Sequence, residues 1–290
     1  MEILSCENVA FKYIESTDYA ISDCTFSVKK GEKIMLCGAS GSGKSTLLRL
    51  LKRELSPRGE LSGNITLMGK DRSELSDRES AEKIGFVMQS PDSQTVCDKV
   101  SAELAFGLES FGVKSGEIQS RVGEMAAFFG IEPLYDRDIS TLSGGQKQLV
   151  ALCSVMATDP DILLLDEPTA QLDPVAAREL LGILDRLNKE MGVTIIIAEH
   201  DPEELFDSCD KILYLAKGKT EFFGTPALTA KYFVENALEG FLPETAKAFA
   251  RLCDDLPLNV RQGRAKLEKL GVTDIPKQAV TDTERAEPYA

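Results

Sequence analysis

Short apolar runs separated by longer amphipathic segments dominate the pattern of hydrophobic and polar positions along the chain. Four of these runs predict β-strands: they are KIMLC at 33–37, KIGFVM at 83–88, DILLLD at 161–166 and VTIIIA at 193–198. The last two are apolar almost throughout, as expected for parallel strands that are covered on both faces. Because strand-like and helix-like segments alternate, the sequence predicts an α/β fold with a mostly parallel sheet.

The segments around these runs predict three further parts. The first 30 residues alternate between apolar and polar positions, which is typical of an antiparallel β region. Between about 95 and 158 the apolar spacing is helical, so an inserted helical subdomain is expected there. A hairpin is expected over 211–226. We therefore predict one main domain over 1–225 and a small helical C-terminal extension over 226–290 that ends in a frayed tail.

Composition narrows the class of partner. The chain has 33 basic and 47 acidic residues, a net charge of −14, which disfavours nucleic acid as a partner because phosphate backbones attract basic surfaces. Its seven cysteines are odd in number and include no Cys-x-x-Cys pair, which favours reduced thiols. We expect no signal peptide and no membrane span, so that any membrane association would go through another protein.

A glycine-rich segment predicts a phosphate-binding loop. GASGSGKST follows the strand at 33–37 and opens a helical pattern, which is the context that Gly-x4-Gly-Lys-Ser requires. Its backbone amides and the following helix N-terminus would bind phosphate, Lys44 would reach the β- and γ-phosphates, and the Ser45 hydroxyl would hold Mg²⁺. The alternative is a glycine-rich turn with a chance lysine. The residues expected to bind phosphate are Gly38, Ala39, Ser40, Gly41, Ser42, Gly43, Lys44, Ser45 and Thr46.

Acidic and polar side chains follow the predicted parallel strands. Asp166 ends one strand and would hold Mg²⁺, and Glu167 beside it could act as a general base toward water. Gln89 follows the strand at 83–88, and its neutral amide could contact both metal and water. His200, the single histidine, follows the strand at 193–198. Each residue also has a structural alternative. Asp166 and Glu167 could form an acidic helix cap, and Gln89 could be a solvated loop glutamine. His200 could be a hydrogen-bonded histidine at a strand end.

A second candidate anion site lies in the helical region. Ser143, Gly144 and Gly145 precede a helical pattern, and small residues at a helix start can bind an anion. The alternative is a simple helix cap. Since one phosphate loop is already present, a second anion site calls for a second nucleotide or a second copy of the chain.

Together these motifs resemble the nucleotide-binding domain of ABC-type ATPases over about residues 2–225. The matched motifs are Walker A (GASGSGKST), the Q-loop Gln89, the signature LSGGQ ending at Gln146, Walker B with the catalytic Glu167 (ILLLDE), the D-loop AQLD ending at Asp173, and the switch histidine His200. The resemblance also implies that Tyr13 stacks on adenine.

The resemblance implies an ATP- and Mg²⁺-dependent enzyme that works as a head-to-tail dimer. ATP would lie between Walker A of one subunit and the signature of the other. Lys44, Gln89 and His200 would contact the γ-phosphate from one side, and Ser143 from the other. Glu167 is then the expected base, and His200 would position the γ-phosphate and the attacking water.

A narrower resemblance is to the ATPase subunits of energy-coupling-factor (ECF) importers, which take up vitamins or transition-metal ions. It is carried by QSPDSQ at 89–94, AELAFGLES at 102–110 and EGFLPETAKAFARL at 239–252. It implies a transmembrane coupling protein docked beside the Q-loop, a substrate-binding membrane protein, a dimerising C-terminal extension and a peripheral location on the cytoplasmic face of the membrane.

Three positions depart from the family pattern. Leu149 replaces a frequent arginine, Gln171 replaces a small D-loop residue, and Pro202 follows the switch histidine segment. None removes a group expected to touch phosphate or Mg²⁺, but Gln171 bears on how the subunits pair. The alternative functions are another class of ABC transporter ATPase, a soluble ABC ATPase acting on nucleic acid or ribosomes, and a non-hydrolysing regulator, which the presence of Glu167 and His200 disfavours.

Overall fold

The structure is a computed structural model that describes residues 1–200, 203–253 and 255–269 of the chain. Within them, one sheet of ten strands has the order β5-β4-β1-β2-β10-β9-β3-β8-β7-β6. The strands are β1 Glu2–Tyr13, β2 Ile21–Lys29, β3 Lys33–Cys37, β4 Gly59–Leu67, β5 Lys70–Asp71, β6 Ile84–Val87, β7 Ile162–Asp166, β8 Thr194–Ala198, β9 Lys211–Ala216 and β10 Lys219–Gly224.

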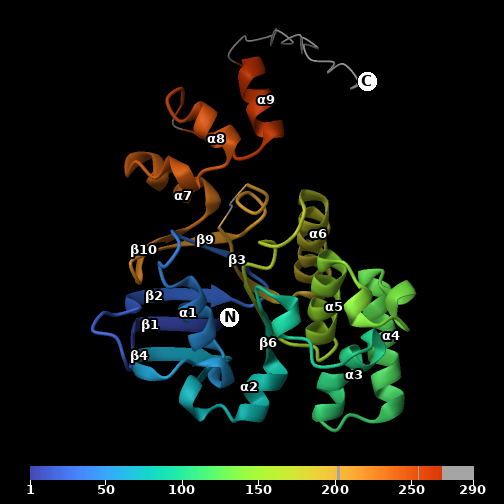
Figure 1. Cartoon of the computed structure of the whole chain (residues 1–290). Coiled ribbons are helices and arrows are strands. Elements are labelled where there is room, and N and C mark those ends of the chain that lie inside the picture. Colours follow the sequence, from blue (N-terminus) through green and yellow to red (C-terminus); the bar gives the residue numbers. More distant parts are fainter. Residues whose placement is uncertain (201–202, 254, 270–290) are drawn as a thin grey trace, which may run out of the picture.

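Helices cover this sheet and extend beyond it (Figure 1). They are α1 Lys44–Leu51, α2 Asp77–Lys83, α3 Val100–Ser110, α4 Ser115–Phe129, α5 Gly144–Met156, α6 Pro174–Met191, α7 Pro226–Glu235, α8 Glu244–Phe249 and α9 Val260–Lys269. Figure 1 shows β1, β2 and β4 on one side of the molecule, α3 to α5 on the other, and α7 to α9 stacked away from both.

The centre of the sheet is parallel, as the apolar runs predict. β3 pairs with β8 and β9, β7 pairs with β8 and β6, and all four pairings are parallel. Successive side chains of β7 point to opposite faces, so Leu163 and Leu165 join one buried cluster while Ile162 and Leu164 join the other. All four predicted strands are thus confirmed, with both faces covered.

The antiparallel parts are confirmed as well. β1 pairs antiparallel with β2 and β4, and β9 and β10 form the predicted late hairpin. A single parallel pairing, Lys219 with Asp23, joins the hairpin to the antiparallel strands. That pairing makes one continuous sheet of the two regions.

The helical segments follow the predicted order along the chain. α3 to α5 lie within 95–158, where helical spacing replaces the strand pattern. The helix after the phosphate loop ends at Leu51 and continues as a separate 3-10 turn, Arg53–Leu55. In the extension, the segment around 239–252 forms only the 3-10 turn Glu239–Phe241 and the six-residue α8. The domain boundaries at 225 and 226 stay a prediction. The expected frayed tail at 281–290 and Pro202 lie outside the described residues.

The C-terminal extension is attached to the segment after His200. The backbone amide of Glu244, the first residue of α8, donates to the Glu203 carboxylate at 2.7 Å, which caps that helix. Asn259 donates to Asp207 at 2.7 Å, and the ring of Phe206 contacts that of Phe233 on α7. The extension therefore packs directly on the polypeptide that leads away from the candidate site.

A buried lysine joins three elements at the edge of the sheet where β3 begins. Lys33, the first residue of β3, is only 2% exposed. Its ammonium forms an ion pair with Asp185 of α6 and donates to the Ser208 hydroxyl at 2.9 Å. A buried ammonium is costly unless it is paired, so Asp185 adds a charge contact to the apolar face by which α6 packs on the sheet.

Replacing Asp185 tests that pairing. Asp185→Ala should lower the free energy of unfolding by about 2 kcal/mol in urea denaturation, because the Lys33 ammonium stays buried without its charge partner. Glu190→Ala is a control on the same helix: it removes only an exposed ion pair with Arg186, worth less than about 1 kcal/mol. Equal losses of unfolding free energy in the two variants would show that the buried pair stabilises the fold no more than the exposed pair does.

Candidate functional site

The phosphate loop connects β3 to α1 through close backbone packing. Gly43 has φ +104°, and a Cβ there would lie 2.6 Å from the Ala20 carbonyl oxygen. A Cβ on Gly38 would collide with the Leu215 carbonyl oxygen. Only glycine fits these two positions, so the loop is pressed against β2 and β9. The first amides of a helix have no carbonyl partner within it, so those of α1 can bind an anion.

Two polar side chains of the loop are buried. The Lys44 ammonium is 5% exposed and donates to the Gly38 carbonyl at 2.9 Å and to that of Ala39 at 3.4 Å. The Ser42 hydroxyl is buried and has no hydrogen-bond partner among the described residues. A buried hydroxyl without a partner is costly, and phosphate oxygens would supply the missing acceptor. The loop thus fits a nucleotide phosphate.

Ser45 and Asp166 form the pair expected to hold Mg²⁺. The Ser45 hydroxyl donates to the Asp166 carboxylate at 2.7 Å, which joins the start of α1 to the end of β7. Burial raises the pKa of Asp166, while the Ser45 hydroxyl and Arg49 favour its charged form. A hydroxyl and a carboxylate oxygen at this distance are suitable ligands for a small hard cation, so the donor set fits Mg²⁺.

Glu167 contacts two of the other predicted residues. One carboxylate oxygen lies 3.7 Å from the Lys44 ammonium, and the other accepts from the side-chain amide of Gln89 at 3.2 Å. Its backbone has φ +48°, a left-handed conformation that costs a non-glycine residue about 1 kcal/mol or more. Its amide donates to the Ala198 carbonyl at 2.9 Å, which holds this turn against the end of β8. The structure therefore brings Lys44, Gln89 and Glu167 together.

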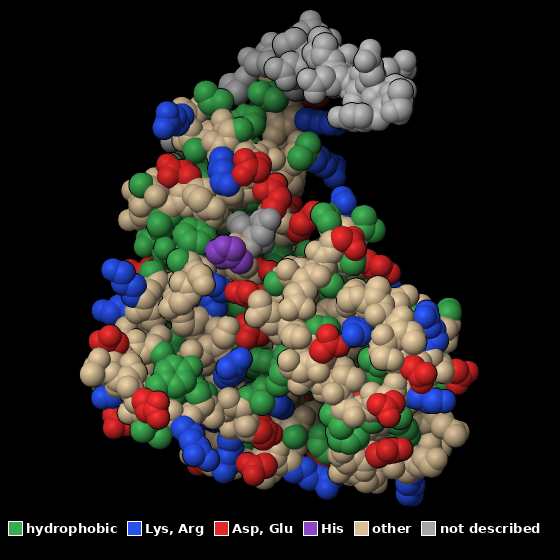
Figure 2. All heavy atoms as spheres, viewed as in Figure 1, with side chains coloured by type: hydrophobic (Ala, Val, Ile, Leu, Met, Phe, Trp, Pro, Cys, Tyr) green, Lys and Arg blue, Asp and Glu red, His purple; other side chains and the backbone are tan. Residues whose placement is uncertain are grey.

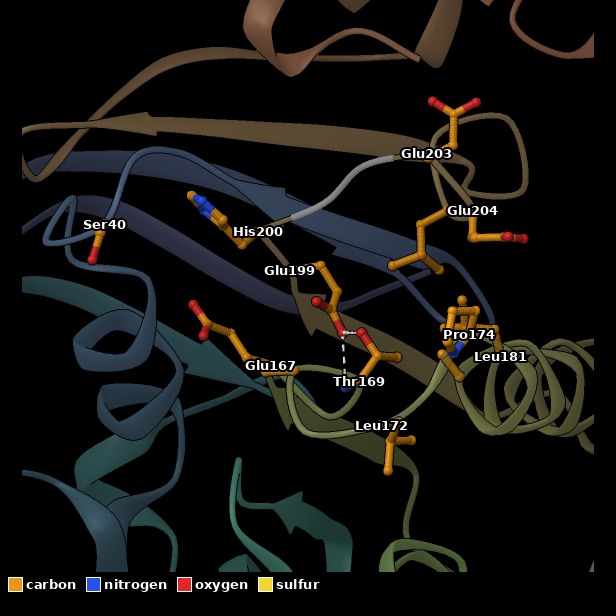
Figure 3. Close-up of a pocket in the computed structure, with 13 residues that line it drawn as sticks. Ser40, Glu167, Thr169, Leu172, Pro174, Leu181, Glu199, His200, Glu203 and Glu204 are labelled. Carbon is orange, nitrogen blue, oxygen red and sulfur yellow. Dashed lines mark hydrogen bonds between the residues drawn. The ribbon is translucent and has the colours of Figure 1, made fainter. Parts of the chain in front are cut away.

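His200 lies at the surface, one residue beyond the buried Glu199. Figure 2 shows the single histidine on the molecular surface, near acidic side chains. It lines a hollow of about 560 Å³ together with Ser40 and Glu167. Figure 3 shows the three side chains around this space, each from a different loop at the same edge of the sheet. His200 thus shares this hollow with Ser40 of the phosphate loop and with Glu167.

The signature residues lie elsewhere. Ser143 caps α5: its hydroxyl accepts from the Gln146 amide at 3.3 Å, and the Gln146 side chain accepts from the Ser143 amide at 3.0 Å. A Cβ on Gly145 would contact Ala176 of α6 at 3.0 Å, so the signature packs beside the D-loop and α6. It lines a separate hollow of about 430 Å³ that, within the described chain, includes no phosphate-loop residue. The helix-cap alternative is therefore true in this structure, and it is compatible with an anion site.

Two further predicted residues have defined partners. The Tyr13 hydroxyl lies 2.9 Å from the Thr46 hydroxyl, which places the ring beside the phosphate loop. Adenine stacking by Tyr13 stays a prediction. Asp173 caps α6 by accepting from the amides of Val175 and Ala176, and these hydrogen bonds lower its pKa.

Sequence reasoning missed two residues that organise the site. Glu199 is 5% exposed and accepts from both the amide and the hydroxyl of Thr169. The signal was an acidic residue directly after an apolar strand, a position where a charge is buried only with partners. Gln94 closes the loop that carries Gln89, by accepting from the Met88 amide and donating to the Phe86 carbonyl. A local sequence pattern does not disclose either contact.

A phosphate loop, a serine–carboxylate pair and a base candidate at one sheet edge define a class of nucleoside-triphosphate-binding proteins. Residues 21–170 match the ABC transporter family model. The chain therefore belongs to the ABC transporter family. The expected P-loop ABC ATPase fold is confirmed.

The curated proteins that are similar to this chain are described as ABC transporter ATP-binding proteins. An ABC transporter ATP-binding protein of Bacillus thuringiensis subsp. konkukian is 39% identical over 282 residues, covering 97% of this chain and 51% of its own length. One from Pyrococcus abyssi is 39% identical over 228 residues, covering 78% of this chain and 81% of its own length. This chain thus spans about half the length of the Bacillus relative.

Solved structures agree with the fold. The cbiO1 protein of Clostridium perfringens, part of the ABC transporter complex cbiONQ, has a TM-score of 0.73 and 32% identity, over 91% of this chain and 98% of that one. A dimeric ATP-binding cassette in a post-hydrolysis state with ADP and Pi has a TM-score of 0.66 and 27% identity, over 77% and 98% of the two chains.

In the described ranges of our structure, no helix is long and apolar enough to cross a membrane.

Replacing Glu167 tests its role as the base. Glu167→Gln should lower kcat by about 100-fold or more, because the amide cannot accept a proton from water, while ATP binding stays within about threefold. Steady-state hydrolysis and nucleotide titration measure the two effects. Equal hydrolysis rates in wild type and variant would remove Glu167 from the mechanism.

Replacing His200 separates positioning from binding. His200→Ala should lower kcat by about 10- to 100-fold and change ATP affinity far less, since the phosphate loop supplies most contacts to the nucleotide. Glu190→Ala, at an exposed position of α6, serves as a control outside the hollow. Parallel losses of binding and hydrolysis in His200→Ala would return this residue to a structural role.

Proposed function

We propose that this chain is the ATP-hydrolysing subunit of a membrane importer of the ECF type, which takes up a vitamin or a transition-metal ion. ATP would close a pair of cassettes, and hydrolysis would reopen them. The observation that carries the proposal is an exposed apolar groove connected to Gln89, on the surface between the sheet and the helical segments. The chain itself would remain a peripheral subunit on the cytoplasmic face of the membrane.

The groove is suited to a helix of a membrane partner. It has a volume of about 270 Å³ and lies between β6, α3 and α5. Val96 and Phe106 line it with 65% and 42% of their surface exposed. Exposed apolar side chains that gather in one groove are typical of a protein interaction site. An apolar or amphipathic helix end from a transmembrane coupling protein is the occupant we propose.

Hydrogen bonds connect this groove to the candidate catalytic groups. Gln94 lines the groove, and its side chain holds Met88 and Phe86, directly before Gln89. In the same segment, Asp92 forms an ion pair with Lys147 of the signature helix α5 at 2.7 Å. A partner that displaces this segment would therefore act on both Gln89 and α5, which supports ATP-dependent coupling through the groove.

The roles of the site residues follow from this function. We assign ATP binding to Tyr13 and the loop 38–46, and Mg²⁺ binding to Ser45, Gln89 and Asp166. Glu167 would accept the proton of the attacking water. When bound, Mg²⁺ would neutralise the phosphate charge, while this chain's Lys44 and His200 hold the γ-phosphate.

A second cassette would complete the site. Ser143, Gly144, Gly145 and Gln146 would contact ATP held by that partner, with Asp173 shaping the contact as the cap of α6. Two observations support the pairing: the separate position of the signature and the dimeric post-hydrolysis cassette among the similar structures. The partner is a second copy or a related cassette, and Gln171 in the D-loop would contribute to that choice.

The ECF class rests on finer similarities. The cbiO1 protein, which covers most of this chain, is part of the cbiONQ complex. By analogy, we propose a substrate-binding membrane protein as a further partner, and the extension from 226 onward as a dimer contact. Its exposed Leu228, Leu252 and Val260 support such a contact. We propose no nucleic-acid partner, in keeping with the net charge of −14.

Co-purification from native membranes tests the importer. The wild-type chain should bring integral membrane proteins with it, and Phe106→Glu should lose them, because a buried charge in the groove disfavours an apolar partner. Tyr135→Glu, an exposed aromatic position of the helical region outside the groove, is the matched control. Identification of the retained proteins would give the transporter class.

Two outcomes would contradict this function. Wild-type protein that brings no integral membrane protein would argue against a transporter subunit. ATP hydrolysis stimulated by DNA or RNA would favour the soluble ABC ATPase instead. Loss of the partner in both Phe106→Glu and Tyr135→Glu would place the contact outside the groove.

A further inference from the structure

A buried carboxylate lies between the two loops that carry the base candidate and the switch histidine. Glu199 follows the last residue of β8, precedes His200 and is 5% exposed. Figure 3 shows its side chain directed toward Thr169, in the turn that follows Glu167, and away from the phosphate loop that carries Ser40. An ionised carboxylate in such a position is costly unless its oxygens accept several hydrogen bonds.

Those hydrogen bonds come from the turn after β7. One oxygen of Glu199 accepts from the Thr169 amide at 3.1 Å and from the Thr169 hydroxyl at 2.7 Å (Figure 3). Burial raises the pKa of Glu199, while Thr169 and the backbone amide of His200 favour the charged form. The carboxylate is thus stabilised by both loops at once.

The peptide bond that precedes Glu199 is also held by hydrogen bonds. Its own amide donates to the Leu36 carbonyl of β3 at 3.2 Å, and the preceding Ala198 carbonyl accepts from the Glu167 amide at 2.9 Å. Glu199 therefore contacts β3, which leads into the phosphate loop, and the turn after β7, which carries Glu167. Its side chain adds the second attachment of that turn to the end of β8.

That second attachment bears directly on Glu167. The turn is closed by the Ala170 amide donating to the Glu167 carbonyl at 3.2 Å, and Glu167 itself has φ +48°. A residue in a sparsely populated conformation keeps it only when its surroundings hold it there. The Ala198 carbonyl holds the turn at its first residue, and Glu199 holds it two residues further on.

We propose that Glu199 is a positioning residue for ATP hydrolysis, which holds the turn carrying Glu167 to the strand end carrying His200 through its two hydrogen bonds to Thr169. The carboxylates of Glu167 and Glu199 have different tasks. Glu167 contacts Lys44 and Gln89, whereas Glu199, which lines the same hollow, has one oxygen occupied by Thr169. In this role Glu199 acts through Glu167 and His200, and the KM of its variants tests for a direct contact with the nucleotide.

Variants of the full-length chain separate position from charge. Glu199→Ala removes both hydrogen bonds, and kcat for ATP hydrolysis should fall by about 10- to 100-fold, as expected when a catalytic group moves by a fraction of an ångström to one ångström. Glu199→Gln keeps an acceptor oxygen for Thr169, so its kcat should stay within about threefold of wild type. The KM for ATP should remain within about threefold in both variants, since the phosphate loop is untouched.

Two further variants keep the test decisive. Glu204→Ala removes an exposed carboxylate that lines the same hollow, and its kcat should equal that of wild type. Thr169→Val removes one of the two donors without touching Glu199, and kcat should fall by about fivefold. This second variant decides the question if Glu199→Ala does not fold.

Three results would overturn the role. Wild-type kcat in Glu199→Ala or Thr169→Val would show that the attachment is not needed. A loss in Glu199→Gln as large as in Glu199→Ala would assign the effect to charge. A raised KM with unchanged kcat would assign Glu199 to nucleotide binding. The inference rests on ATP hydrolysis alone, so a failed co-purification from membranes would leave its test unaffected.

Discussion

The parallel pairing of β3, β8 and β7 is the constraint on which the site depends. Leu36 pairs with Ala198, and Ala198 pairs with Asp166, so the three strands end level with one another. Parallel strands direct their carboxyl ends to the same edge, which is where open α/β sheets bind ligands. The phosphate loop, the turn after β7 and the loop with His200 therefore begin within one or two residues of a shared line. A slip of one residue in any of these pairings would turn its buried side chains to the opposite face.

Charge is concentrated at that edge in a way that the net charge does not reveal. The buried ammonium of Lys44 lies near Glu167, while burial raises the pKa of both Asp166 and Glu199. Each buried carboxylate is stabilised by a hydroxyl: Asp166 by Ser45 and Glu199 by Thr169. A nucleotide and its metal ion would enter a site whose charged groups are already oriented, and such preorganisation is the main source of catalysis in phosphoryl transfer.

Hydrogen bonds and one ion pair also connect the segments of the site to distant surfaces of the molecule. Gln94 and Asp92 link the segment after β6 to the exposed groove and to α5. On the other side, Glu203 and Asp207 join the segment after His200 to the C-terminal helices. On that side the polar contacts are accompanied by apolar packing, since Phe206 contacts Phe233 of α7 and both belong to one buried cluster. The segment after His200 and the C-terminal helices are therefore joined by polar and apolar contacts together.

The sequence by itself determined the elements of the fold and most of the chemistry. Apolar runs bounded by polar residues predicted β3, β6, β7 and β8, and the spacing of glycine, lysine and serine predicted the phosphate loop. These signals are local, because a buried strand and a tight loop each depend on the types of consecutive residues. The motifs also led to Asp166, Glu167, Gln89 and His200, which the structure brings to one edge of the sheet.

Only the tertiary structure decided how these groups are held. Glu199 partners Thr169 across 30 residues, and Lys147 partners Asp92 across 55, so no local pattern could predict either pair. The ends of α1 at Leu51 and of α8 at Phe249 are not marked in the local pattern of apolar and polar positions. The physical reason is common to these cases: a buried charge or a helix end depends on which distant groups arrive beside it, and the chain's neighbours in space are set by the packed sheet.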